Sequence, residues 1–140
     1  MTNPKDIIDN ILTMLKAAAD LAALKNHWHK GEPLPGTWNK FPFGWVEWSG
    51  GPGKPRSVTI NEFTEQVHIV VVCMHVDHKR AEDSAMEYAA LIKDVLSADY
   101  TLLGAVARSW CSARVKDKFF TSTNHNLTVV RVTWTVTYLE

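Results

Sequence analysis

Apolar residues recur at steps of three and four along the first part of the chain. Asn3 and Pro4 precede this stripe: an Asn side chain can cap free amides, and Pro suits a first turn whose N–H groups have no partner. The pattern predicts one amphipathic helix from Asn3 to about Leu24. The stripe consists of Ile7, Ile8, Ile11, Leu12, Leu15, Ala18, Ala19 and Ala22.

The second part of the chain alternates between strand and helix periodicity, with β-branched residues concentrated in the expected strands. The expected elements are a strand at Val58–Ile60, a stronger strand at Glu65–Val76, a helix at Arg80–Ser97 and two final strands at Gly104–Val115 and Leu127–Leu139. The order is therefore helix, strands, helix and two strands. It predicts an α+β fold, a small, mainly antiparallel sheet with two helices packed on one face.

A long connection, residues 26–57, separates the first helix from the main strands. It is rich in Pro, Gly and Trp, and only Gly44–Trp48 has the pattern of a short strand. Residues 49–56 are small or ring-locked, so we expect a flexible loop that becomes ordered only against a neighbouring protein. Gly50, Gly51, Lys54 and Arg56 of this loop are candidate contacts with a second subunit or another partner.

The last expected strand has two different faces. Val130, Val132, Trp134, Val136 and Tyr138 alternate with Arg131, Thr133, Thr135 and Thr137, which predicts one core face and one solvated face. In the strand before it, small residues from Ala105 to Ala113 share one side, and Val106, Arg108, Trp110 and Arg114 share the other. We expect the small side to allow a helix to approach closely.

The strand Glu65–Val76 differs because both of its faces are apolar. One face carries Val67, Ile69, Val71 and Cys73, and the other carries Val70, Val72, Met74 and Val76. Two helices cover one face of a small sheet, so the second needs another cover: either the Trp-rich connection or another subunit. Under the second alternative, Val70, Val72 and Met74 form a subunit interface.

Composition narrows the classes of function. The 140 residues suit a single domain, and 15 Lys and Arg balance 15 Asp and Glu, so no long-range field attracts nucleic acid or anionic lipid. Charged residues within the first twenty positions do not fit a secretory signal, and we expect an intracellular protein. The longest apolar run, Ile69–Met74, is far shorter than the ~20 residues of a membrane-spanning helix.

Cys73, His75 and His78 have a spacing that is conceivable for a transition-metal site. His78 follows the end of the strand and a fourth ligand cannot be assigned, so we expect no metal and no cofactor. Cys73 and Cys111 lie within expected strands, and we predict reduced, buried and unreactive thiols. No nucleophile or general base can be named, which favours a protein that is not an enzyme.

Two further ligand classes are weakly supported. The Gly50–Gly53 run lacks the strand-to-helix context of a phosphate loop, and its proline removes an amide donor. Tryptophans near lysines in the connection would suit single-stranded nucleic acid, but the net charge is zero and no Arg precedes Arg56. We therefore expect no specific nucleic-acid binding.

The element order and one local motif resemble a known family. The motif is Asp-x-Thr-Leu-x-Gly at Asp99–Gly104, and it is accompanied by the alternating strand Val129–Tyr138. Together they resemble the tail terminator proteins of long-tailed bacteriophages, which are similar to the minor tail protein U of lambda-like phages. The connection of residues 26–57 departs from that pattern in length and Trp content, so no functional residue is carried over.

The resemblance implies a structural protein of the virion tail that assembles in the host cytoplasm. Such a protein forms a homo-oligomeric ring, usually a hexamer, on the head-proximal end of the tail tube and presents a surface to the head–tail connector. Its partners would be copies of itself, the tail tube protein and the connector. A second hypothesis is a small-molecule or metal-binding α+β module with the Trp-rich segment as a lid or Cys73, His75 and His78 as ligands.

Overall fold

The computed structural model describes residues 3–34, 41–51, 53–55, 61–75, 78–120 and 126–139. Its elements follow the predicted order, and the α+β class is confirmed. They are α1 (Pro4–Ala17), the 3₁₀ helix η1 (Ala19–Leu24), β1 (Trp28–Lys30), β2 (Phe43–Gly50), β3 (Gly53–Pro55), β4 (Asn61–His75), α2 (His78–Ser97), β5 (Arg108–Phe120) and β6 (Asn126–Leu139). The short strands β1 and β3 were not predicted, and the strand expected at Val58–Ile60 lies outside the described residues.

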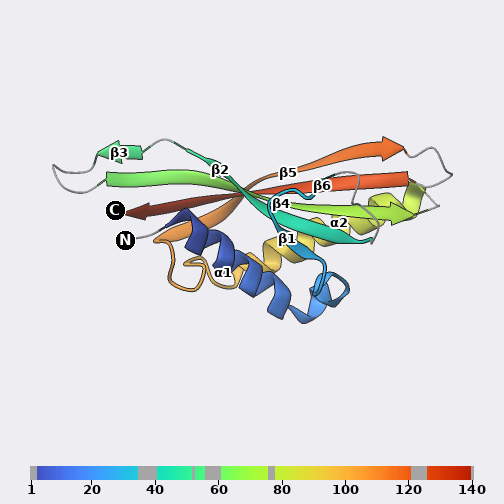
Figure 1. The fold of residues 1–140 in the computed structure, drawn as a ribbon, viewed down its shortest axis with the longest axis horizontal. Coiled ribbons are helices and arrows are strands. Elements are labelled where there is room, and N and C mark those ends of the chain that lie inside the picture. Colours follow the sequence, from blue (N-terminus) through green and yellow to red (C-terminus); the bar gives the residue numbers. More distant parts are fainter. Residues whose placement is uncertain are drawn as a thin grey trace.

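The strands form one sheet in the order β1-β2-β4-β6-β5, with β3 paired to the beginning of β4 (Figure 1). The β1–β2 pair is parallel and the other pairs are antiparallel, as the prediction of a mainly antiparallel sheet required. Strand β4 is long enough to pair with β2 and β3 on one side and with β6 on the other. The main strands therefore lie in the middle, and β5 lies at one edge.

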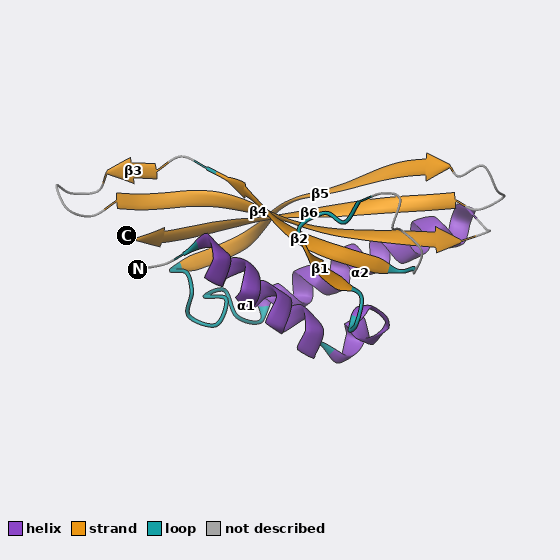
Figure 2. Ribbon diagram, in the orientation of Figure 1, coloured by secondary structure: helices purple, strands orange, loops and turns teal. Residues whose placement is uncertain are grey.

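Both helices pack on the same face of the sheet (Figure 2). The core between the layers contains the apolar stripe of α1, the inward positions of α2 and one face of β4 and β6. Among the residues whose side chains are described, Trp134 is the largest that is completely buried. The predicted core face of the last strand is confirmed, because Val130, Val132, Trp134, Val136 and Tyr138 are all buried.

The first helix begins as predicted but ends earlier. The Asn3 side chain accepts a hydrogen bond from the Lys5 amide at 2.9 Å, with Pro4 in the first turn. The helix ends at Ala17 because Ala18 is extended, with ψ 120°, and a 3₁₀ helix follows. This break turns Leu21 and Leu24 into the core, where they are fully buried. Burying a leucine side chain contributes about 1.5–3 kcal/mol, more than burying one of the smaller alanines of the predicted stripe would contribute.

The outer face of β6 is drier than predicted. Thr133, Thr135 and Thr137 are buried, although the alternation had placed them in solvent. Strand β6 lies between β4 and β5, so cross-strand neighbours cover these side chains from both sides. The Thr135 hydroxyl donates a hydrogen bond to Ser112 Oγ at 2.8 Å, so this buried polar group has a partner.

A β-bulge in β5 overturns the predicted faces of that strand. The register with β6 shifts between Cys111 and Ala113, which leaves Ser112 as the extra residue. Because side chains alternate with period two, one inserted residue exchanges the faces of everything that follows. Arg114 consequently lies on the helix side and Trp110 on the opposite side, whereas the sequence had placed them together. The strand also begins at Arg108, after a turn, and not at Gly104.

Candidate interaction surface

The second face of β4 forms a small core within the single chain. Val70 and Val72 are completely buried, and Met74 is partly buried. Val72 has Phe43 of β2 and Val129 of β6 as its cross-strand partners. The proposed subunit interface of Val70, Val72 and Met74 is therefore corrected for the two valines, which have no side-chain surface left for a neighbour.

Aromatic side chains from the Trp-rich connection belong to this small core. Phe41, Phe43 and Trp45 pack beside one another next to the two valines, with ring centroids 5.4 Å apart for the first pair and 6.0 Å for the second. Of the two alternatives that the sequence left open, the first is the one found for Val70 and Val72. Covering this face within the chain removes the penalty of an exposed apolar sheet.

The expected flexible loop at residues 49–56 is also corrected in part. Gly50 ends β2 opposite Gln66, and Lys54 lies in β3 opposite Glu62, so much of the segment is paired to β4. A Cβ on Gly51 would lie 2.1 Å from the Thr64 carbonyl oxygen, so this close approach of two backbones requires glycine. Arg56 lies outside the described residues, and the mobility of this segment stays a prediction.

A different surface gathers exposed apolar side chains. Among the described residues, five of the eight exposed large hydrophobic side chains belong to α2, β5 or the turn between them. We call this surface the β5 flank, and sequence reasoning missed it. It consists of Met86, Tyr100, Leu103, Trp110 and Val115, which are between 41% and 61% exposed.

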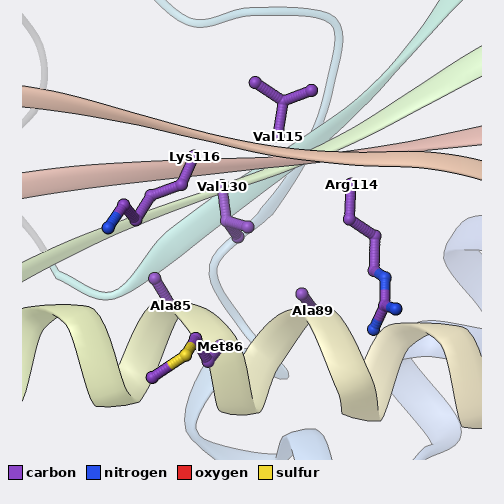
Figure 3. A pocket seen from close by; sticks show the side chains of 7 residues that line it. All are labelled: Ala85, Met86, Ala89, Arg114, Val115, Lys116 and Val130. Atoms are coloured by element: carbon purple, nitrogen blue, oxygen red, sulfur yellow. The ribbon is translucent and has the colours of Figure 1, made fainter.

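A groove of about 400 Å³ runs between α2 and β5 beside this edge. Ala85, Ala89 and Val130 provide an apolar floor, and Arg114 and Lys116 reach toward the helix from β5 (Figure 3). Val115 points away from α2, on the other side of the same strand. The Lys116 amine forms an ion pair with Glu82.

The opposite side of β5 carries one further cation. The Arg108 guanidinium lies 5.6 Å from the centre of the Trp110 ring, which is a cation–π arrangement. All charged side chains of the strand whose positions are described are therefore positive: Arg108, Arg114 and Lys116.

The motif Asp99–Gly104 forms a tight turn at the beginning of this flank. Asp99 accepts hydrogen bonds from the Thr101 amide, the Thr101 hydroxyl and the Leu103 amide, and these bonds lower the pKa of its carboxyl group. Leu102 and Leu103 have φ values of 50° and 60°, in the left-handed region that non-glycine residues rarely adopt. Leu102 is buried while Leu103 is exposed, so the turn anchors one leucine and presents the other.

The two cysteines differ in burial, and the candidate metal ligands do not form a cluster among the described residues. Burial raises the pKa of Cys73 to about 12, in agreement with an unreactive thiol, whereas Cys111 is only partly buried. His75 Nε2 lies 3.0 Å from Ser84 Oγ, and the His78 side chain is not among those described. In the part of the chain that the structure describes, no group of three or more His, Cys, Asp or Glu residues could hold a metal, and no helix is long and apolar enough to cross a membrane.

Sequence reasoning also missed a buried carboxylate. Glu65 is only 4% exposed and accepts hydrogen bonds from Trp48 Nε1 at 2.8 Å and from the Tyr138 hydroxyl at 2.9 Å. Phe63 stacks on Tyr138 beside it. These partners come from three strands, and the chain separation of Glu65 and Tyr138, 73 residues, leaves no local signal for the contact. The cluster ties the end of β2 to β4 and β6.

No protein-family model and no curated protein matches the chain. Among solved structures, a chain in a structure titled "Virion of native gene transfer agent (GTA) particle" matches with a TM-score of 0.46 and 11% sequence identity. The alignment covers 91% of this chain and 91% of that chain. A similarity at this level does not define a family.

Proposed function

We propose that this protein is a structural component of a bacteriophage-like virion, a tail terminator that forms a homo-oligomeric ring on the tail tube and joins it to the head–tail connector. Its role is mechanical, and it is not an enzyme. The observation that carries the proposal is the β5 flank, where exposed apolar side chains are concentrated on α2, β5 and the turn between them. Patches of this kind mark protein–protein contacts.

Two features support an assembly role over a ligand-binding role. The element order resembles that of the tail terminator family, and the Asp99–Gly104 motif forms a turn held by three hydrogen bonds to one carboxylate. That turn presents Tyr100 and Leu103 on a defined backbone, so the flank is a preformed surface. The resemblance sets the expected ring at six subunits.

The test is the state of the purified protein. Size-exclusion chromatography with light scattering is expected to give one species of uniform subunit number, and negative-stain images should show closed rings. A chain that stays monomeric at roughly the 0.1 mM level, far above the Kd of a stable interface, would contradict the ring. Addition of tail tubes should then place the ring at one end of each tube.

A further inference from the structure

The β5 edge is the longest strand edge in the described sheet that lacks a partner. Strand β5 has 13 residues and pairs only with β6, whereas the other peripheral strands, β1 and β3, have three residues each. An edge strand presents alternate backbone N–H and C=O groups outward, ready to pair with another chain. Pro55 lies in β3 and lacks an N–H, so that edge is poorly suited to further pairing.

We infer that the β5 edge binds an extended segment of another polypeptide as an added antiparallel strand, with acidic side chains on its helix side and apolar side chains on its outer side. This inference deepens the proposed function and rests on it for the existence of such a partner in the virion. It assigns the β5 edge, with Trp110 and Val115, to a different protein and leaves Met86, Tyr100 and Leu103 of the β5 flank for contacts between ring subunits.

The two faces of β5 define the chemistry of the segment. On the helix side, an added strand would meet Arg114 at the rim of the groove, where a carboxylate pairs favourably with the cation, and beside it Lys116, which is ion-paired with Glu82. On the outer side it would meet Trp110 and Val115, which are partly exposed and apolar, with Arg108 over the Trp110 ring at the beginning of the strand. Because side chains alternate across a strand, a segment that alternates acidic and apolar residues satisfies both faces at once.

A second copy of this chain is a poorer occupant. Antiparallel pairing of two β5 strands about Val115 would place Arg114 of each copy opposite Lys116 of the other, and like charges on opposed strands are destabilising. The bulge at Ser112 and the cations on the helix side also discourage indiscriminate pairing at an open edge. These features make the edge selective for an acidic partner.

The probe is a capped peptide of about nine residues, the length of a long strand, that alternates glutamate and valine. Fluorescence anisotropy at neutral pH measures its binding to the full-length protein, and amide exchange by NMR locates the site. We expect saturable binding that weakens with salt and newly slowed exchange at alternate amides of β5. Two control peptides are matched in length. One has lysine in place of glutamate, and the other has all its glutamates followed by all its valines; each is expected to bind at least about ten-fold more weakly.

Charge reversal on the protein provides the reciprocal test. Arg114→Glu should weaken the glutamate peptide about ten-fold or more and strengthen the lysine peptide, whereas Lys25→Glu, an exposed change at the end of η1, should leave both unchanged. Circular dichroism of each variant confirms that it is folded.

Several results would overturn the inference. These are equal binding of both peptides, exchange protection away from β5, slowed exchange of β5 in the protein alone as its concentration rises, or tighter binding of oligothymidylate than of the glutamate peptide. The last two would assign the edge to a second copy or to nucleic acid. Ring formation is measured separately, so rings without peptide binding refute this inference alone, and peptide binding without rings refutes only the proposed terminator.

Discussion

Replacing Val72 by aspartate tests whether the chain itself covers the second face of its sheet. Val72 is fully buried between Phe43 and Val129. Losing its apolar burial costs about 2 kcal/mol. A buried carboxyl avoids the larger cost of an unpaired charge by staying protonated, which at pH 7 costs about 4 kcal/mol for a group whose ordinary pKa is near 3.9. The total approaches about 6 kcal/mol, comparable with the ~5–15 kcal/mol stability of a whole domain.

The expected result is a protein that is unfolded or barely folded at pH 7 and recovers at lower pH. Burial raises the folded-state pKa of the new carboxyl group above its unfolded value, so its penalty is smallest below the unfolded pKa and grows as pH rises. At pH 5 the protonation cost falls to about 1.5 kcal/mol, so stability relative to the parent should rise by nearly 3 kcal/mol between pH 7 and pH 5. Urea unfolding followed by far-ultraviolet circular dichroism at both pH values measures this difference.

Val115→Asp is the matched control because Val115 lies in β5, on the same outer side of the sheet, and is 47% exposed. Its cost should stay within about 1 kcal/mol, the span of strand propensities. A Val72→Asp protein as stable at pH 7 as this control would show that the second face is open in solution. Folded monomers where the parent forms rings would restore the alternative in which a neighbouring subunit covers that face.

Three further predictions concern single sites. A polar thiol reagent should label Cys111 in the native protein, whereas Cys73, with a pKa of about 12, should react only after denaturation; fast native labelling of both would contradict its burial. Gly44→Ala should lower thermal stability by the equivalent of about 1–3 kcal/mol, because its Cβ would lie 2.8 Å from the Val70 carbonyl oxygen, and an unchanged melting temperature would refute that contact. Asp99→Ala should lower the melting temperature at pH 7 and make that temperature fall less steeply below about pH 4. The reason is that the pKa of Asp99 is lowered in the folded state. Its carboxylate therefore stabilises the fold above the unfolded pKa, and this stabilisation is lost as pH falls through the folded pKa. An equally steep fall of the melting temperature below about pH 4 in parent and variant would exclude this role of Asp99.

Periodic elements were predictable because their burial pattern is written in consecutive residues. The helix around Ala85 and the strand around Trp134 follow from repeats of 3.6 and 2 residues, and both are found near the predicted bounds. Strands β1 and β3 have three residues each, too few to establish a period. The break at Ala18 depends on a tertiary competition between alanines and leucines for the core, which no local pattern contains.

The candidate surface was harder to predict than the fold for a related reason. Alternation in β4 correctly indicated that both of its faces avoid water, but it could not show whether Phe43 or another subunit provides the cover. In β5 a single extra residue, Ser112, reverses the sides of Arg114 and Val115. Strict alternation therefore placed Arg114 beside Trp110, whereas the bulge puts Arg114 and Lys116 on the helix side and leaves Trp110 and Val115 on the other.

Most of the large exposed apolar side chains that the structure describes lie on α2, β5 and the turn between them, and not in the Trp-rich connection. Phe43 and Trp45 of that segment are buried in the small core on the second face of the sheet, so a partner cannot contact their side chains. The β5 flank instead stands on regular elements and on a turn in which Asp99 holds Leu102 and Leu103 in an unfavourable backbone region. A surface built this way loses little entropy on binding, because its shape exists before the partner arrives. Such preorganisation suits a part that must be recognised repeatedly and identically during assembly.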